Sequence, residues 1–295
     1  MTTAVRSSLV LHDSVDDAFI DQYRRDGFAI LRDALAAAEV AEVNAEALRI
    51  CRAGLHPVDS GVDAHPGQSD ADVLRQYLCI HHPHKLSETA MNVMRHPRLV
   101  DGLTSVIGPN VKAMQSMLFI KSEGKPGQAW HQDEHFIPTR DRSLCGVWIA
   151  LDDATTENGC LWVLPGSHAR GVLYPDREQT DDRFDCTDEA FGFPYTDDDA
   201  IAVEVPAGAA LFFNGYLLHR SLENSGAHGY RRALVNHYMS AESLLPWQNA
   251  EGRHIAEYDF RDIVMVAGED PYAYKGLRDL NIPGSRADKS GGCDR

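Results

Sequence analysis

The chain has 295 residues, of which 43% are hydrophobic and 24% charged, a composition typical of one globular domain with a sizeable core. Its formal net charge of -16 disfavours binding to nucleic-acid phosphates and to anionic membrane surfaces. We therefore expect a single domain over residues 1–295, a monomer or homodimer, that acts on a small molecule and has no nucleic-acid or membrane partner.

The cysteines and the ends of the chain indicate a reduced, cytoplasmic protein. The first eleven residues contain one arginine and a very short apolar patch, unlike a signal peptide. No run of about 18 apolar residues is present to span a membrane. The six cysteines form no CxxC pair and show no regular spacing, which favours free thiols over a disulfide framework: Cys51, Cys79, Cys145, Cys160, Cys186 and Cys293.

Residues 1–110 are mainly helical in pattern and form the supporting part of the domain. Capping residues, apolar spacing of three to four and terminal glycines set the boundaries. The predicted elements are a helix from Ser14 to Gly27, a strand over 28–31, a helix capped by Asp33 and ending at Gly54, a loop over 55–70, a strand over 73–80, a helix from Ser87 to Met94, and a helix from Pro97 to Gly108.

From Val111 to about residue 240 the pattern changes to short, apolar or alternating segments bounded by Gly, Pro and Asn. Eight strands are predicted, over 111–121, 129–133, 144–151, 160–164, 201–205, 209–213, 217–222 and 232–239. Eight antiparallel strands in two sheets form a jelly roll whose open mouth can hold a ligand. We expect a mainly β protein with flanking helices: a cupin-like double-stranded β-helix, N-terminal helices packed on one sheet, and a C-terminal extension over 241–295.

Residues 174–200 interrupt the strands with an acidic insert. It is strongly acidic and shows no periodicity, with Asp181, Asp182, Asp185, Asp188, Asp197, Asp198 and Asp199 among its aspartates. A long insert inside a compact domain is usually a lid over a site or a solvated loop. The sequence leaves these two interpretations equally open.

The stretch Trp130-His131-Gln132-Asp133 is the strongest chemical signal. A histidine and a carboxylate two residues apart on a strand point to the same face. Together with one more histidine from a distant strand, such a pair forms a 2-His-1-carboxylate triad, which suits Fe(II) and leaves coordination positions open. His219, which lies 86 positions after Asp133 at the end of an apolar strand, is the third ligand that we expect.

Two other histidine patterns are weaker metal candidates. The His81-His82-Pro83-His84 cluster has no cysteine or carboxylate ligands at a defined spacing, which favours a polar loop near a pocket mouth. His131 and His135 are four apart, as on a zinc-binding helix, but Gln132 replaces the glutamate of HExxH and Pro138 follows closely. No Gly-x-Ser-x-Gly elbow is present for serine hydrolase chemistry.

Further motifs follow in order: Glu157 to His168 (ENGCLWVLPGSH), Pro206-Ala207-Gly208 leading into Leu211-Phe212-Phe213, His219-Arg220-Ser221, and Tyr230-Arg231-Arg232-Ala233-Leu234. In type, order and spacing they resemble the phytanoyl-CoA dioxygenase family of iron(II) and 2-oxoglutarate dependent oxygenases. The resemblance runs from about Asp17 to about Ser240. It implies that His131, Asp133 and His219 hold Fe(II), with 2-oxoglutarate and O2 as co-substrates.

The resemblance also implies which residues contact 2-oxoglutarate. Arg231 matches the arginine that clamps the distal carboxylate, a planar two-point contact that lysine cannot make. Its neighbour Arg232 is the competitor, since adjacent strand residues face opposite ways and one of the two faces the barrel interior. The remaining positions expected around the co-substrate are Ser221, Gln132, Met117 and Trp148, with Gln115 as a weaker candidate; Met117 and Trp148 equally suit a barrel core.

Asp133 bears on the type of reaction that the resemblance implies. Related iron halogenases have a small residue here so that chloride can bind, and a carboxylate blocks that position. We therefore expect hydroxylation of an unactivated C–H bond with release of succinate and CO2. Desaturation, epimerisation or cyclisation by the same iron chemistry, and a catalytically silent jelly-roll binding protein, are the alternatives.

The substrate is not defined by the sequence beyond a small to medium-sized metabolite. The acidic charge and the acidic insert disfavour an anionic CoA thioester. Aromatic and cationic residues that flank the metal motif or the predicted mouth equally suit substrate contact or ordinary packing: Trp130, His135, Phe136, Arg140, Arg142, Tyr77, His81 and Lys121.

Overall fold

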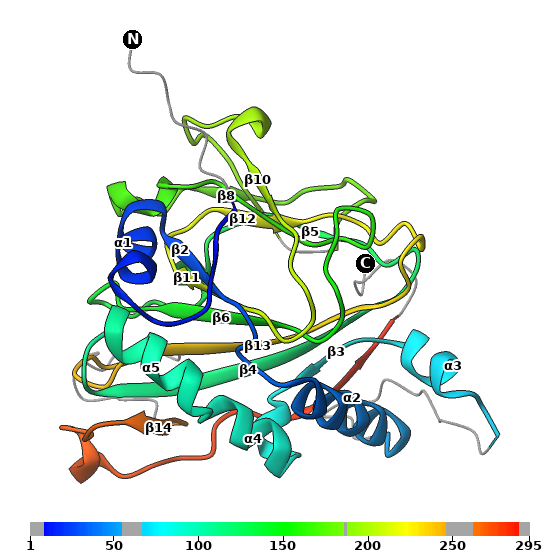
Figure 1. Cartoon of the computed structure of the whole chain (residues 1–295), viewed down its shortest axis with the longest axis horizontal. Helices are drawn as coiled ribbons and strands as arrows, with labels where there is room; N and C mark the ends of the chain where they lie inside the picture. The colour runs from blue at the N-terminus through cyan, green and yellow to red at the C-terminus, as the bar shows by residue number, and fades with distance from the viewer. Residues whose placement is uncertain (1–8, 55–66, 186–187, 246–261, 289–295) are drawn as a thin grey trace.

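The structure is a computed structural model, and it describes residues 9–54, 67–185, 188–245 and 262–288. Two β-sheets face each other, with helices covering the outer side of the larger sheet (Figure 1). The helices are α1 (Asp17–Asp26), α2 (Ala37–Arg52), α3 (Asp70–Arg75), α4 (Glu88–Met94), α5 (Pro97–Val106) and α6 (Asp133–Phe136), with short 3-10 turns η1 (Pro83–Lys85), η2 (Ser167–Arg170), η3 (Asp197–Asp199) and η5 (Ala273–Lys275).

The larger sheet has nine strands within the described ranges. Its order is β1 (Leu11–His12), β2 (Phe28–Leu31), β11 (Ala210–Asn214), β6 (Cys145–Ala150), β13 (Arg231–Ser240), β4 (Val111–Lys121), β3 (Tyr77–His81) and β15 (Gly284–Ala287), and β14 (Val264–Ala267) also pairs with β4. All its pairs are antiparallel except β1 with β2.

The smaller sheet has the order β10 (Ile201–Val203), β7 (Leu161–Val163), β12 (His219–Ser221) and β5 (Gln128–His131), all antiparallel. It faces β11, β6, β13 and β4 of the larger sheet (Figure 1). These eight strands form the jelly roll, so the predicted fold class is confirmed. Strands β8 (Asp176–Arg177) and β9 (Glu189–Ala190) form a separate hairpin in the acidic insert.

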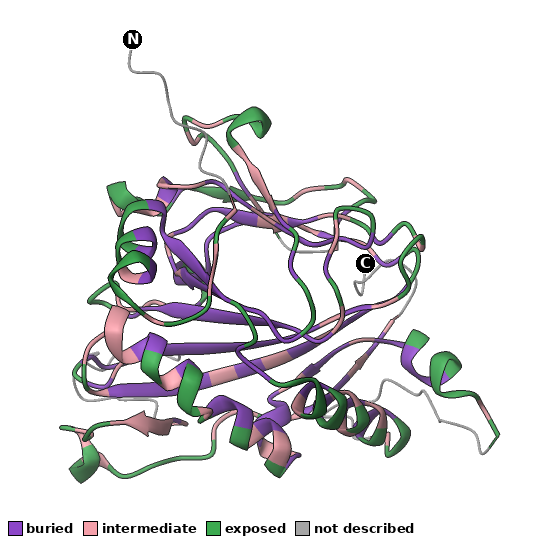
Figure 2. Ribbon diagram, in the orientation of Figure 1, coloured by how far each residue is buried: buried purple, intermediate pink, exposed green. Residues whose placement is uncertain are grey.

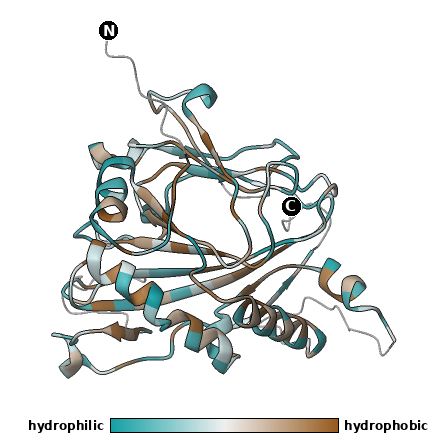
Figure 3. Cartoon of the chain, viewed as in Figure 1, coloured by the Kyte–Doolittle hydropathy of each residue, from teal (hydrophilic) through white to brown (hydrophobic). Residues whose placement is uncertain are grey.

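Strands β2 and β6 of the larger sheet are buried along their whole length, which explains why they read as apolar runs (Figures 2 and 3). On β6, Val147 and Ile149 pack with the helices, whereas Trp148 and Ala150 pack with the smaller sheet. Likewise, Phe212 of β11 faces the helices. The strands therefore alternate between a helical layer and the interior of the jelly roll.

Helices α1, α2, α4 and α5 contribute to the core on the outer face. Phe19 of α1 packs edge to face on Phe212, with ring centroids 5.3 Å apart. Helix α5 approaches the same ring at Gly102, where a Cβ atom would lie 2.6 Å from the Phe212 ring. The predicted packing of the N-terminal helices on one sheet is confirmed, and a glycine makes the closest approach possible.

Three N-terminal boundaries differ from the sequence prediction. Asp16 and not Ser14 caps α1, because its carboxylate accepts a hydrogen bond from the Phe19 N–H at 3.0 Å. Asp33 lies in a left-handed turn, and α2 begins only at Ala37, where the Glu39 side chain accepts from the Ala36 N–H. The strand predicted over 73–80 begins only at Tyr77, as β3, because residues 70–75 form the helix α3, which Ser69 caps.

The strand predicted over 129–133 is shorter than expected. It ends at His131, and Asp133 is the first residue of the short helix α6. His131 and Asp133 therefore do not share a strand face, and the turn at Gln132 brings them together.

The predicted 55–70 loop lies largely outside the described residues. No helix among the described residues is long and apolar enough to cross a membrane.

Candidate active site

Two histidines and one carboxylate converge inside the jelly roll. Strands β5 and β12 pair so that His131 and His219 stand directly opposite each other. The Nε2 atoms of His131 and His219 lie 3.7 and 3.5 Å from Asp133 Oδ1. Candidate ligand atoms of all three residues lie within 4.8 Å of one another, and all three residues are buried. The triad predicted from the sequence is therefore assembled.

Backbone carbonyls orient both imidazoles. His131 Nδ1 lies 2.7 Å from the Ala129 carbonyl oxygen, and His219 Nδ1 lies 3.0 Å from that of Leu217. Because a carbonyl can only accept, each Nδ1 carries a proton, and each Nε2 is directed at the Asp133 carboxylate. Burial, then the neighbouring His219, lowers the pKa of His131 to about 4, so its imidazole is neutral near pH 7.

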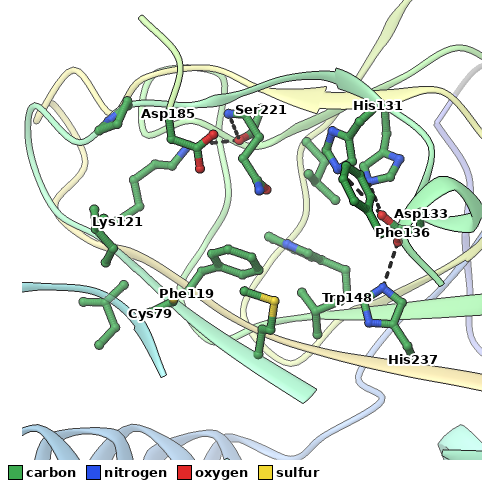
Figure 4. A pocket seen from close by; sticks show the side chains of 18 of the residues that line it. Cys79, Phe119, Lys121, His131, Asp133, Phe136, Trp148, Asp185, Ser221 and His237 are labelled. Carbon is green, nitrogen blue, oxygen red and sulfur yellow. Dashed lines mark hydrogen bonds and ion pairs between the residues drawn. The ribbon is translucent and has the colours of Figure 1, made fainter. Parts of the chain in front are cut away.

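His237 on β13 holds the other oxygen of the carboxylate, and sequence reasoning missed it. Its Nε2 donates to Asp133 Oδ2 at 2.8 Å (Figure 4), which leaves Oδ1 directed at the two histidines. Burial raises the pKa of Asp133, but the adjacent His219 and His237 and this hydrogen bond outweigh burial, so the pKa lies below its usual range. Parity along β13 was an available signal, since residues 231 and 237 share a face.

A cavity of about 450 Å³ contains the triad. Its lining includes five of the six residues predicted to surround the co-substrate: Gln115, Met117, Trp148, Ser221 and Arg231. Phe213 lies beside the metal ligands, with its ring centroid 4.8 Å from that of His219, whereas Lys121, Asp185 and Ser221 lie toward the other end of the cavity (Figure 4). One cavity thus joins a metal-binding set to a cationic end.

The two adjacent arginines of β13 point to opposite sides. Arg231 lines the cavity, is 3% exposed, and donates from Nε to the Gly159 carbonyl at 3.0 Å. Burial lowers its pKa to about 10, which leaves the guanidinium charged near neutral pH. Arg232 faces outward and forms a two-point contact with Asp152 at 2.6 and 2.8 Å. Of these two neighbours, Arg231 is therefore the one that lines the cavity.

Gln132 is placed differently from the prediction. It does not line the described cavity; its side-chain amide donates to the Val172 and Tyr216 carbonyls at 2.9 and 2.7 Å, and its Oε1 accepts from the Tyr174 N–H. A buried amide with three backbone partners ties the loops around α6 together. The Gln132 side chain therefore holds the loops next to the site in place.

The other histidine patterns do not form metal clusters in the described part of the chain. His135 pairs with Asp176, with Nε2 and Oδ2 3.4 Å apart. His84 is buried with its Nδ1 2.6 Å from Ser116 Oγ, so the 81–84 segment is a packed turn and not the polar loop that the sequence suggested.

The suggested mouth residues divide into two groups. Phe136 and Lys121 line the cavity, and Phe136 is 46% exposed beside the His131 ring. The others do not line it: Tyr77 is fully buried under the helices, and Trp130 packs beneath Arg220 on the outer side of the smaller sheet. In the acidic insert, Asp185 and Asp188 reach the cavity, because residues 183–185 pair with Gly127.

A jelly roll that carries two histidines and a carboxylate at one buried point defines a non-haem iron protein with a facial triad. The family model of phytanoyl-CoA dioxygenase (PhyH) matches residues 23–233. The chain belongs to this family.

Curated relatives agree with this assignment. A phytanoyl-CoA dioxygenase of Arabidopsis thaliana is 38% identical over 117 residues, which is 38% of each chain. The peroxisomal phytanoyl-CoA dioxygenase of Rattus norvegicus is 27% identical over 268 residues, covering 88% of this chain and 77% of the relative. The alignments with the relatives from Arabidopsis thaliana, Oryza sativa and Danio rerio span less than half of those proteins, 38%, 45% and 47%.

Solved structures share the fold at low sequence identity. The non-heme monooxygenase ThoJ, in its apo form, has a TM-score of 0.62 at 22% identity, over 85% of this chain and 84% of that chain. The epimerase SnoN, in complex with Fe3+, alpha ketoglutarate and nogalamycin RO, has a TM-score of 0.59 at 21% identity, over 86% and 96%. EvdO2 from Micromonospora carbonacea, complexed with 2-oxoglutarate, has a TM-score of 0.59 at 23% identity, over 82% and 100%.

Proposed function

We propose that this protein is an Fe(II) and 2-oxoglutarate dependent dioxygenase that hydroxylates an unactivated C–H bond of a small to medium-sized metabolite. The observation that carries the proposal is a single cavity with two imidazoles and a carboxylate at one point and a buried guanidinium at another. The first set suits Fe(II), and the guanidinium suits a carboxylate of the co-substrate.

The donor set fits iron without rearrangement of its hydrogen bonds. His131, His219 and Asp133 would hold the ion through Nε2, Nε2 and Oδ1, because the other polar atoms of these side chains already have partners. Bound Fe(II), 2-oxoglutarate and O2 supply oxidative decarboxylation to succinate and CO2, coupled to oxidation of the substrate.

The remaining residues position the reactants and exclude water. Arg231 would clamp the distal carboxylate, with Ser221 as a hydroxyl partner. The Trp148 ring lies under the guanidinium, and its centroid is 5.7 Å from Arg231 Cζ. Phe213 stands beside the triad, with its ring centroid 4.8 Å from that of His219, and Leu161 lines the cavity opposite Ser221. A fixed site of this kind favours one orientation of a bound C–H group. Gln115 and Met117 line the same cavity and remain candidate contacts.

The Asp133 carboxylate favours hydroxylation over halogenation, because it occupies the position at which a halogenase would bind chloride. Desaturation, epimerisation and cyclisation use the same ligand set, so the product must separate them. An added oxygen atom in the product mass indicates hydroxylation, whereas loss of two hydrogens or an unchanged mass indicates an alternative.

The four described cysteines are buried free thiols, which supports our expectation of a reducing, cytoplasmic location.

The proposal is tested by incubating Fe(II)-loaded protein with 2-oxoglutarate, O2 and a metabolite panel, measuring succinate and product masses. We expect succinate release that increases with a true substrate, and none in Asp133→Ala, which lacks the ligand oxygen. A matched control is His84→Gln, which alters a buried polar side chain outside the cavity. Undiminished succinate release by Asp133→Ala would contradict the metal assignment. Binding of 2-oxoglutarate without turnover of any compound would favour a binding protein.

A further inference from the structure

A second cavity, of about 610 Å³, lies outside the jelly roll, and the proposed function assigns it no role. We call it the outer cavity. It lies on the face of the smaller sheet that points away from the larger sheet, where the β8–β9 hairpin and η3 approach β5 and β12 (Figure 1). Trp130 and Arg220 belong to its lining, and each is one residue away from a candidate metal ligand, His131 or His219. Because neighbouring strand residues face opposite ways, the outer cavity and the catalytic cavity share no lining residue.

Aromatic rings form the apolar part of the outer cavity, and the described residues of its lining include no aliphatic side chain. The Trp130 ring is 5% exposed beneath the Arg220 guanidinium, whose central carbon lies 4.6 Å from the ring centroid. Phe193 packs edge to face on Trp130, with centroids 6.3 Å apart, and Tyr195 follows at 6.5 Å from Phe193. Phe193 and Tyr195 are only partly buried, so part of each ring can contact a ligand. The face of such a ring carries partial negative charge and attracts C–H groups.

The charged side chains of the outer cavity largely neutralise one another. Three ion pairs join the arginines of its lining to carboxylates: Arg177 with Glu189, Arg183 with Asp181, and Arg220 with Asp197. Glu178 adds one more carboxylate to the lining. An anionic ligand would therefore find no uncompensated arginine and would be repelled by the acidic residues. The charges of the lining disfavour a carboxylate or phosphate ligand.

Arg220, the least exposed arginine of the outer cavity, favours a ligand that has hydrogen-bond acceptors. Its side chain is 14% exposed, and the described residues give its buried Nε no hydrogen-bond partner. Its partner Asp197, 3.1 Å away, is 69% exposed. A guanidinium only donates, a carboxylate only accepts, and a hydroxyl group does both. Adjacent hydroxyls of one ligand can therefore accept from Arg220 and donate to Asp197, whereas an ammonium group cannot accept from Arg220.

We propose that the outer cavity is a second ligand site and that it binds a neutral saccharide. A pyranose ring combines the two properties that the lining selects, because hydroxyls surround its edge and C–H groups cover its faces. The hydroxyls would bridge Arg220 and Asp197, and one face of the sugar ring would lie on Tyr195 or Phe193. The site requires neither iron nor 2-oxoglutarate, since its lining includes no candidate ligand of either.

A purely structural role for the same residues makes a different prediction. The Arg220–Asp197 pair joins β12 to η3, and in a structural role it would serve only to hold the acidic insert on the smaller sheet. Loss of the pair would then lower stability, and no saccharide would bind to the intact protein. A saccharide site predicts binding to the wild-type protein that depends on these side chains.

The test is anaerobic calorimetry on the full-length, Fe(II)-loaded protein, with and without 2-oxoglutarate. The probes are the methyl glycosides of glucose, galactose and mannose, and the charged sugars glucuronate and glucosamine. We expect at least one neutral glycoside to bind, with a lower dissociation constant than either charged sugar. The constant should be the same with and without 2-oxoglutarate, because the two cavities are separate.

Three variants locate the bound glycoside. Arg220→Met keeps an apolar stem over Trp130 but removes the donors, and we expect the dissociation constant to rise about tenfold or more, as for loss of a hydrogen bond to a charged group. Tyr195→Ala removes a partly buried ring, so it should weaken the same glycoside even if Arg220→Met fails to fold. Phe136→Ala changes the lining of the catalytic cavity and should leave the constant unchanged.

A matched pair of charge variants tests the selectivity of the outer cavity. Asp197→Asn leaves the Arg220 guanidinium without its carboxylate partner, and we expect it to bind glucuronate more tightly than the wild-type protein does. Asp198→Asn removes the same charge from the same turn but lies outside the lining, and should not change glucuronate binding. An equal change in both variants would contradict the role of Asp197 in the site.

Three results would overturn the proposal: no binding of any neutral glycoside, tighter binding of a charged sugar by the wild-type protein, or weakening by Phe136→Ala in place of the outer-cavity variants. None of them bears on the oxygenase function, because none depends on turnover. Failure to bind 2-oxoglutarate would overturn the proposed function and leave the saccharide site standing.

Discussion

The two faces of strand β13 carry different tasks. On the inner face, Arg231 and His237 line the cavity and Val235 lies between them. On the outer face, Leu234 and Tyr238 pack against the helices, and the Tyr238 hydroxyl donates to the Met94 carbonyl at 3.0 Å. The strand alternation puts chemistry and stability on neighbouring residues of one element. Substitutions one residue apart should therefore have effects of different kinds.

The largest expected effect comes from the two arginines. Arg231→Ala should raise the KM for 2-oxoglutarate about a hundredfold, because a two-point charged contact is lost. Arg232→Ala removes a partly exposed pair with Asp152 and should lower stability by about 1 kcal/mol or less, with KM unchanged. Succinate kinetics and urea unfolding measure the two quantities. A larger KM effect in Arg232→Ala would reverse the assignment of the two faces.

The second prediction concerns His237, on the inner face of β13. His237→Phe removes the donor to Asp133 Oδ2, and such supporting hydrogen bonds typically contribute about 10–100-fold to metal affinity. We expect a loss of that size in Co(II) or Fe(II) affinity, with partial recovery in His237→Gln, which can still donate. Metal titrations followed by the Co(II) absorption spectrum provide a readout independent of turnover. Wild-type affinity and an unaltered spectrum in His237→Phe would reduce His237 to a packing residue.

The smallest effect on turnover is expected from the outer face. Leu234→Ala removes a fully buried side chain and should lower the free energy of unfolding by about 2–5 kcal/mol. Turnover per folded molecule should remain unchanged at a temperature where the variant is folded. Urea denaturation and active-site titration with Fe(II) test both parts. A loss of turnover without a loss of stability would show that the two faces are coupled.

The sequence was sufficient for the β core because burial on both faces produces unmistakable apolar runs. It was less informative where local capping decides the outcome. Residues 73–75 have β-compatible side chains, but the Ser69 cap starts a helix just before them. Similarly, Asp133 belongs to α6 because the chain turns at Gln132, which backbone contacts with distant loops hold in place.

The sequence predicted those site residues that belong to recognisable motifs. His219 followed from its order in the chain, although nothing local shows that β12 pairs in register with His131. His237 and the pairing of Lys121 with Arg231 depend on strand register, which only the assembled sheet defines. Gln132 was assigned to the co-substrate by its position in a motif, whereas its side chain is engaged by the backbone of neighbouring loops.

The most direct test of the central claim is anaerobic reconstitution with Fe(II) and 2-oxoglutarate, followed by visible spectroscopy of wild type and His219→Ala. We predict a weak charge-transfer band of the iron–2-oxoglutarate chelate in the wild-type protein, and no band in His219→Ala, which lacks one ligand. If the wild-type protein binds iron but shows no band, the oxygenase assignment is contradicted.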